Sequence, residues 1–270
     1  MLPDERRTYI YRYLHQYEHV PISELVKMLD VSHMTIRRDL KVMEGEGKVA
    51  IISGGVKLNQ ALIQELPYVE KAMLHHSVKR NIGVIAERFI EPGSVVYLDA
   101  GTTTYEIARE VAHKLKKITV ITNDFTIAEF LMTVPHINLF HTGGQVDVRN
   151  RSSIGYSAAQ FIRQHNIEVA FISTSSWDFE RGISTPDEGK MLVKHAVIES
   201  SRRNVLVSDS SKYGKYGMFH ICALEQMDDI VCDNQLPPEI IMKIQQLPLR
   251  LHQAKASLTK KGELKCSSLE

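Results

Sequence analysis

The run Asp99-Ala-Gly-Thr-Thr-Thr104 places a carboxylate, a glycine and three hydroxyl groups directly after the apolar stretch Val95–Leu98. Apolar residues at helical spacing follow, so the run is expected to join a strand to a helix. Small hydroxylated residues at such a turn gather donors at a helix N-terminus, where the helix dipole and unpaired N–H groups favour an anion such as phosphate. The chemistry indicated is therefore anion binding.

Polar residues also end the other expected strands. The apolar runs at 118–121, 137–140, 169–172 and 205–207 are followed by Thr122, Asn123 and Asp124, by Gly143 and Gly144, by Thr174 and Ser175, and by Asp209 and Ser210. A single such strand end is equally explained by a helix cap or a turn. Together they predict one ligand crevice, because open α/β sheets bind ligands at the carboxyl ends of their strands.

The short motifs of nucleotide hydrolases, dinucleotide enzymes and zinc proteases are absent from the sequence. The three Cys residues have no C-x-x-C spacing, so they suggest neither a disulfide framework nor a zinc site. Ser152 and Ser153 follow Arg151 without a G-x-S-x-G elbow, so we expect them to contact a ligand or cap a helix. We therefore assign no catalytic residue, no metal site and no cofactor.

The elements that must position these groups belong to an α/β fold. From Val78 onward, strand-like runs alternate with helix-length segments, which predicts a mainly parallel sheet with helical crossovers. The chain has 270 residues, of which 43% are apolar and 24% charged, as in a soluble globular protein of one or two domains. It has neither a signal peptide nor an apolar stretch of ~18 residues, so we expect a cytoplasmic protein without membrane contact.

The N-terminal region follows a different pattern, with three short amphipathic helices and a hairpin between Asp4 and Leu58. Ser23 and Ser32 are placed to cap the second and third helices. The hairpin turns at Ser53-Gly54-Gly55, where glycine dihedrals are needed. The expected organisation is a winged helix-turn-helix at 1–58, a linker at 59–77, an α/β domain at 78–251 and a polar tail at 252–270.

The third helix is expected to present a basic face. Steps of about 100° per residue place Ile36, Leu40 and Met43 on the core side, and Arg38 and Lys41 on the opposite side. A helix packed in this way offers its polar side to a DNA major groove. The DNA-contacting residues predicted are Ser32, His33, Met34, Thr35, Arg37, Arg38 and Lys41 on the helix, with Ser53, Gly54, Gly55 and Lys57 on the wing.

The net charge of +1 by itself argues against a nucleic-acid binder, and residues 1–58 hold nine Lys and Arg against eight Asp and Glu. What favours DNA is segregation, since three cations oppose only Asp39 on the exposed side of the third helix. Arg37 or Arg38 would read a guanine, while lysines such as Lys41 would contact phosphates. The alternative is an ordinary solvated helix face, and His33 is either a base reader or a boundary residue.

These residues resemble a known family. The run Val31-Ser-His-Met-Thr-Ile-Arg-Arg-Asp-Leu40 with the Gly54-Gly55 turn is similar to the winged helix-turn-helix of the DeoR family of bacterial transcription regulators. The resemblance continues through the C-terminal part, in Asp99-Ala-Gly-Thr-Thr-Thr104, Thr122-Asn123, Gly143-Gly144, Gly182-Ile-Ser-Thr185 and Asp209-Ser-Ser-Lys212. It covers nearly everything except the tail.

The resemblance implies a sensor domain with the fold of ribose-5-phosphate isomerase, usually without its activity. It assigns phosphate to Gly101, Thr102, Thr103 and Thr104, sugar hydroxyls to Asp99, Asn123 and Asp187, and either part to Lys212. Asp124, Gly143, Gly144 and Ser152 complete the predicted site. The chain departs from the family at Lys190-Met191, where many members have an acidic residue and alanine. Lys190 would favour a more acidic ligand such as a phosphorylated sugar acid, or it is an ordinary surface lysine.

Two functions remain open at this point. The first is a repressor of carbohydrate metabolism that binds double-stranded operator DNA as a homodimer or homotetramer and responds to a phosphorylated sugar effector. The second is a sugar-phosphate isomerase-like enzyme with an accessory DNA-binding domain, since Asp99, Asp187 and Lys212 are groups capable of proton transfer.

Overall fold

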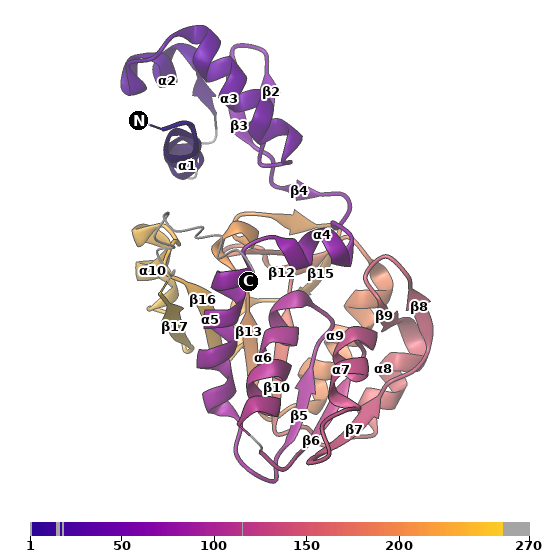
Figure 1. Cartoon of the computed structure of the whole chain (residues 1–270). Helices are drawn as coiled ribbons and strands as arrows, with labels where there is room; N and C mark the ends of the chain where they lie inside the picture. The colour runs from indigo at the N-terminus through magenta and orange to yellow at the C-terminus, as the bar shows by residue number, and fades with distance from the viewer. Residues whose placement is uncertain (1, 15–16, 18, 115, 256–270) are drawn as a thin grey trace, which may run out of the picture.

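The computed structural model describes residues 2–14, 17, 19–114 and 116–255, which form a small helical unit connected to a larger α/β unit (Figure 1). The small unit contains the elements α1 (Pro3–Leu14), β1 (Val20–Pro21), α2 (Ile22–Leu29), α3 (His33–Gly45), β2 (Val49–Ile52) and β3 (Gly55–Leu58). Its strands pair antiparallel in the order β1-β3-β2. The predicted helices and hairpin are thus confirmed.

The apolar stripe of α3 packs as the helical spacing predicts. Ile36 and Leu40 are fully buried and Met43 is almost so, in a core shared with Ile10 and Leu25 of the first two helices. The predicted cap at Ser32 is confirmed, since its hydroxyl accepts a hydrogen bond from the Thr35 N–H at 3.1 Å. The predicted cap at Ser23 is wrong: α2 begins two residues earlier, at Ile22 after Pro21, because proline presets the extended backbone of the N-cap position.

The prediction that Asp39 lies on the exposed side of α3 is also wrong. Asp39 is only 3% exposed and accepts from Nε of Arg6 at 2.5 Å and from a guanidinium nitrogen of Arg7 at 3.5 Å. These ion pairs join α1 to α3 inside the small unit. The carboxylate therefore does not offset the charge of the exposed cations of α3, because it is already neutralised by α1.

The larger unit is built on a seven-stranded sheet in the order β17-β16-β13-β10-β5-β6-β7. Every neighbouring pair in it is parallel, which confirms the predicted sheet type. The strands are β5 (Val95–Leu98), β6 (Ile118–Thr122), β7 (Ile137–His141), β10 (Val169–Ser173), β13 (Asn204–Val207), β16 (Asp229–Asp233) and β17 (Arg250–Ala254). The last two were not predicted.

Helices cover both faces of this sheet (Figure 1). Alternate residues of a strand point to opposite faces, so Val96 and Leu98 contact one core and Tyr97 the other. The first core is shared with α5 (His76–Ala86), α6 (Thr102–His113) and α7 (Phe125–Leu131). The second is shared with α8 (Gly155–Arg163), α9 (Glu188–Ser200) and α10 (Pro238–Ile244).

Short elements surround the main sheet. They are β4 (Ala61–Leu62), α4 (Tyr68–Met73), η1 (Glu87–Phe89), β8 (Gln145–Asp147), β9 (Ser152–Ile154), β11 (Ser176–Asp178), β12 (Gly182–Thr185), η2 (Ser210–Lys212), β14 (Tyr216–Gly217), β15 (Phe219–Cys222) and η3 (Leu224–Gln226). β4 pairs with β14, so the chain leaving the wing is bound to the larger unit before α4 begins.

The segment predicted as a linker, 59–77, therefore contains β4, α4 and the start of α5. Of the predicted tail, residues 252–254 end β17, and residues 256–270 lie outside the described part of the chain. The domain boundaries themselves stay a prediction.

Candidate functional site

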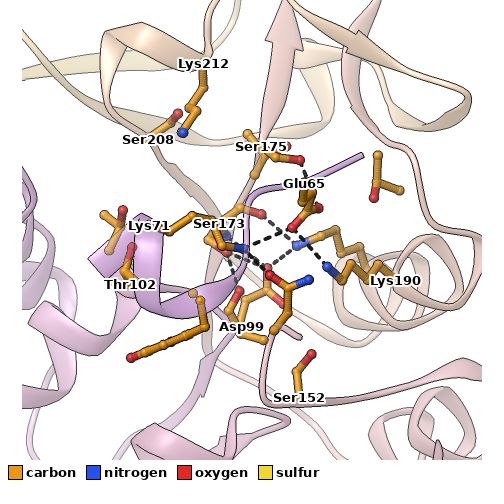
Figure 2. A pocket seen from close by; sticks show the side chains of 18 of the residues that line it. Glu65, Lys71, Asp99, Thr102, Ser152, Ser173, Ser175, Lys190, Ser208 and Lys212 are labelled. Carbon is orange, nitrogen blue, oxygen red and sulfur yellow. Dashed lines mark hydrogen bonds and ion pairs between the residues drawn. The ribbon is translucent and has the colours of Figure 1, made fainter. Parts of the chain in front are cut away.

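A pocket lies over the carboxyl ends of β5, β10 and β13 (Figure 2). From β5 the chain proceeds to β6 and β7 on one side, and later to β10 and β13 on the other, so β5 and β10 flank the point where the strand order reverses. Such switch points form ligand crevices in open α/β sheets, because the connections leave in opposite directions. The pocket therefore has the position expected of a binding site.

Most of the predicted ligand residues line this pocket. Those that do are Asp99, Gly101, Thr102, Thr103, Asn123, Ser152, Lys190 and Lys212. Those that are not part of its lining are Thr104, Asp124, Gly143, Gly144 and Asp187. The expected convergence of five strand ends is therefore correct for four of them, since Gly143 and Gly144, which follow the edge strand β7, do not line the pocket.

The residues outside the lining stabilise the local structure. Asp124 accepts from the Thr126 and Ile127 N–H groups at the start of α7, and Asp187 accepts from the Lys190 N–H at the start of α9. Thr104 donates its hydroxyl to the backbone, to the carbonyl of Asp99 at 2.6 Å. These residues cap helices and stabilise turns, which is the alternative to ligand binding for isolated polar residues after strands.

Two of the lining residues also shape the turn after β5. The Asn123 side-chain oxygen accepts from the Tyr97 hydroxyl and the Ala100 N–H, both at 2.9 Å, so it fixes the chain between Asp99 and Gly101. A Cβ atom at Gly101 would lie 2.5 Å from the Ser173 hydroxyl oxygen. Glycine is therefore required here because β5 and β10 approach too closely for a side chain.

The N-terminus of α6 faces the pocket with unpaired donors. Thr102 and Thr103 are the first residues of a 12-residue helix, so their N–H groups have no intrahelical acceptor. The Lys212 ammonium group has no ion pair or hydrogen bond within the described residues. The Ser152 hydroxyl is fully buried in the pocket wall and likewise lacks a partner there. These donors fit a phosphate group, which accepts several hydrogen bonds and a positive charge.

The Asp99 carboxylate forms an ion pair with a buried lysine, Lys194. Its Oδ2 accepts from the Ser173 N–H at 3.0 Å and forms a close ion pair with Lys194, which also donates to the Ser173 carbonyl at 2.6 Å. Lys194 is 7% exposed and lies one helical turn after Lys190 on α9. Lys194 was not predicted, although its spacing of four from Lys190 puts both on one helix face.

A third cluster closes the pocket from the segment before α4. Glu65 lies between Lys71 and Lys190, with its Oε2 at 3.0 and 2.9 Å from their ammonium nitrogens, and its Oε1 accepts from Ser175 at 2.9 Å (Figure 2). Burial alone would raise the pKa of Glu65, but the two lysines hold it well below its usual range. Lys190, with a side chain only 11% exposed, is therefore not an ordinary surface lysine.

Neither Glu65 nor Lys71 was predicted, because residues 59–77 were interpreted as a linker. Their sequence carries no strand end or glycine turn, so only the packing of α4 over the sheet identifies them as part of the pocket. Lys79 on α5 also lines the pocket and was not predicted either. Burial lowers the pKa of Lys79 to about 8, with Lys212 and Lys71 adding to the effect and Asp209 opposing it.

The predicted DNA-contacting residues lie together on α3 and the wing. Arg37, Arg38 and Lys41 are exposed, as is Met34, and the three cations have no ion pair or hydrogen bond with other described side chains. Ser32, His33, Ser53, Gly54 and Lys57 are also exposed, whereas Thr35 is half-buried. The basic face of α3 is thus open to a partner.

Gly55 differs from its expected role. It is buried, and a Cβ atom there would lie 2.5 Å from the Val20 carbonyl oxygen of β1. Its lack of a side chain serves strand pairing rather than approach to phosphate. The left-handed turn is supplied by Gly54, whose φ is +86°.

Two other kinds of feature are absent from the described part of the chain. Within residues 2–255, apart from the few positions the structure does not describe, no group of three or more His, Cys, Asp or Glu side chains is arranged to hold a metal ion. In that same part of the chain, no helix is both long and apolar enough to span a bilayer.

Comparison with known proteins identifies both units. Residues 6–61 match the family described as the DeoR-like helix-turn-helix domain, and residues 74–234 match the DeoR C terminal sensor domain. The chain is 44% identical to an HTH-type transcriptional regulator of Haemophilus influenzae over 93% of this chain and 97% of that protein. It is 32% identical to the transcriptional repressor AccR of Agrobacterium fabrum, over 85% of this chain and 89% of that protein.

Among solved structures, ribose 5-phosphate isomerase A of Methanocaldococcus jannaschii is similar to part of the chain. The match has a TM-score of 0.39 and 15% identity, and it covers 51% of this chain and 54% of that one. With both units matched by family and relatives similar over almost their whole length, the chain belongs to the DeoR family of transcriptional regulators.

Proposed function

We propose that this protein is a DNA-binding repressor of a carbohydrate-metabolism operon, controlled by a phosphorylated sugar or sugar acid that binds in the pocket of the larger unit. The observation that carries the effector half is the set of unpaired donors at one wall of the pocket: the first N–H groups of α6, the Ser152 hydroxyl and the Lys212 ammonium. They match a phosphate in number and charge.

The DNA half rests on α3, whose exposed Arg37, Arg38 and Lys41 are free of ion pairs in the described part of the chain. A helix-turn-helix of this size contacts one half-site, so tight binding calls for a two-fold pair of subunits on a pseudo-palindromic operator. We therefore propose a homodimer or homotetramer in the cytoplasm. To control DNA binding, the effector must bind the DNA-bound and the DNA-free conformation of the protein with different affinities. The coupling free energy between effector and DNA binding is typically 1–3 kcal/mol.

Direct selection of bound DNA tests the first half of the proposal. Purified protein incubated with fragments of its source genome should enrich one or a few sites, and the genes beside them should encode enzymes of sugar metabolism. Failure to enrich any sequence would contradict a regulator that acts on an operator.

Thermal unfolding with a panel of aldose phosphates and phosphorylated sugar acids tests the second half. A ligand at 100 times its Kd stabilises the folded state by about 2.7 kcal/mol, which raises Tm by roughly 5–10 °C for a domain of this size. Lys212→Met should abolish the shift, whereas Lys117→Met, at an exposed lysine away from the pocket, should retain it.

The same incubations distinguish a sensor from an enzyme. An isomerase would convert the aldose phosphate to a ketose phosphate, with pocket carboxylates such as Asp99 moving the proton. Asp99 is instead held by Lys194 and Ser173, which gives its carboxyl group a fixed orientation. We expect stabilisation without turnover, and measurable isomerisation would contradict the sensor function.

The affinity for a phosphorylated effector should also depend on pH through Lys79. Its pKa is about 8 without ligand, and a bound dianion raises it, so binding is favoured while Lys79 carries its proton. The contribution is complete well below pH 8 and is lost as pH rises, by up to about tenfold in Kd per pH unit. Isothermal titration between pH 7 and 9.5 would measure this.

Lys79→Met provides the control, because it removes the titrating group and leaves Lys71, whose pKa burial also lowers, in place. The variant should bind more weakly at pH 7 and lose most of the pH dependence above pH 8. An unchanged profile would assign the dependence to another lysine.

A further inference from the structure

Glu65 occupies the pocket as an anionic ligand would. Its carboxylate makes three polar contacts, with Lys71, Lys190 and Ser175, and its side chain is only 11% exposed (Figure 2). All three partners come from elements other than its own segment, namely α4, α9 and the loop after β10. The cluster is therefore a preformed carboxylate site that the chain itself fills.

The stretch that carries Glu65 has few other attachments nearby. Ile63 is 90% exposed and Leu66 is 45% exposed, although both are apolar. The backbone from Ile63 to Pro67 belongs to no helix or strand. The Glu65 contacts are thus the main side-chain anchor of this stretch, and their loss would free it at small cost in buried apolar surface.

This stretch also connects the pocket to the wing. β3 ends at Leu58, and only six residues separate it from Glu65. Within them, the Asn59 N–H donates to the Lys48 carbonyl of the small unit at 3.0 Å, and β4 pairs with β14 of the larger unit. A displacement of Glu65 therefore acts on the short chain that sets the position of the winged helix.

The pocket has no room for a second anionic group at the lysine cluster while Glu65 is in place. It encloses about 60 Å³, whereas ligand pockets commonly measure about 300–1,000 Å³. The wall formed by Glu65 is the part that can open most readily, because its stretch belongs to no helix or strand, whereas α4, α5, α6, α9 and the strand ends supply the other walls. Within the described residues, removal of Glu65 leaves Lys71 bound to Asn150 and Lys190 bound to Asp147, so the vacated position is cationic.

We propose that Glu65 is an internal competitor of the effector: a carboxylate of a phosphorylated sugar acid replaces it between Lys71, Lys190 and Ser175, and thereby releases the stretch 63–67 that follows β4. The inference rests on the proposed function and specifies its ligand. The phosphate binds at the α6 and Lys212 wall, and the carboxylate binds at the opposite cluster. Lys212 lies beside Ser208 and away from Glu65 in Figure 2, so the two anionic groups of one ligand would occupy separate parts of the pocket.

The test compares matched ligands on matched variants of the full chain. The ligands are 5-phospho-D-ribonate against D-ribose 5-phosphate, and 4-phospho-D-erythronate against D-erythrose 4-phosphate, titrated calorimetrically. The variants are Glu65→Gln, which keeps the shape and removes the charge, and Glu70→Gln at an exposed carboxylate on the adjoining helix. Hydrogen exchange at residues 63–67 reports release of the stretch.

We expect the wild type to bind an acid at least about tenfold more tightly than its aldose phosphate, because only the acid fills the cluster. Glu65→Gln should raise the affinity for the acid about tenfold further, since a competitor that holds the site closed weakens apparent binding in proportion. It should change aldose phosphate binding by less than twofold, and Glu70→Gln should change neither. The acid should speed exchange at 63–67 in the wild type.

Equal binding of acids and aldose phosphates would overturn the inference and leave the sensor function intact. So would an acid affinity that Glu65→Gln leaves unchanged or lowers, since Glu65 would then not compete with the ligand. If no phosphorylated compound of either class bound, the proposed function itself would fail, and this inference with it.

Discussion

Replacement of Arg38 by Ala should abolish specific retention of operator DNA while the protein stays folded. An arginine bound bidentately to a guanine contributes about 1–3 kcal/mol of discrimination. A two-fold pair of subunits loses that contact twice, about 2–6 kcal/mol, which lowers the affinity for the operator by at least about thirtyfold. Arg38 is exposed and unpaired in the described structure, so no contact within the protein is lost.

Fluorescence anisotropy with the selected operator and with a scrambled duplex measures the effect. Arg88→Ala, at an exposed arginine on η1 of the larger unit, is the matched control and should bind like the wild type. Lys41→Ala should act differently, weakening both duplexes and reducing the log–log salt slope by about 0.9. Undiminished operator binding by Arg38→Ala would refute the placement of α3 in the major groove.

Asp39→Asn should strongly destabilise the winged helix. The substitution leaves the guanidinium of Arg6, itself 7% exposed, buried without its countercharge. Removal of one partner of a buried ion pair costs about 3–5 kcal/mol. A domain of fewer than 60 residues has only a small margin of stability, since natural domains are stable by about 5–15 kcal/mol in total. Much of that margin would be lost.

Differential scanning calorimetry of the full chain should show the N-terminal transition at a much lower temperature, with the transition of the larger unit unchanged. Asp4→Asn is a closely matched control, because Asp4 also pairs with Arg7 but its side chain is 90% exposed. Such a surface change is expected to stay within about 0.5 kcal/mol. Equal stability of the two variants would show that the Arg6–Asp39 pair is not structurally important.

The two variants together separate recognition from stability. Arg38 and Asp39 are neighbours in sequence but differ in burial, since Arg38 is exposed and Asp39 is buried. Loss of DNA binding in Arg38→Ala should come with an unchanged melting curve. In Asp39→Asn the loss of DNA binding should follow the unfolded fraction, and low temperature should restore it.

The features that could be predicted from the sequence are those set by local periodicity. The apolar spacing of Ile36, Leu40 and Met43 identified the buried side of α3, and the run from Asp99 to Thr104 identified a strand-to-helix turn. A parallel sheet brings the carboxyl ends of its strands to one edge, so four of the polar strand ends meet as predicted. The order of the strands was not predictable in this way, and β7 at the edge is too far from β10 to contribute.

The surroundings of a charged side chain could not be predicted where its partner lies far away in the sequence. Asp39 fits an exposed helix by composition, but Arg6 and Arg7 are 33 and 32 residues away and bind it from α1. Lys190 fits a surface lysine, but Glu65 lies 125 residues before it and binds it in the pocket. Ion pairs of this kind carry no local sequence pattern, because neither partner constrains its neighbours in the chain.

The sequence by itself therefore determined the family, the two units, the basic helix α3 and the strand-to-helix turn at Asp99–Thr104, because each depends on residues close together in the chain. Only the tertiary structure decided which side chains share the pocket and that Glu65, from the segment interpreted as a linker, lies inside it. That placement depends on the packing of α4 against α6 and on the contacts of Glu65 with Lys190 and Ser175, which bring charges together from distant parts of the chain.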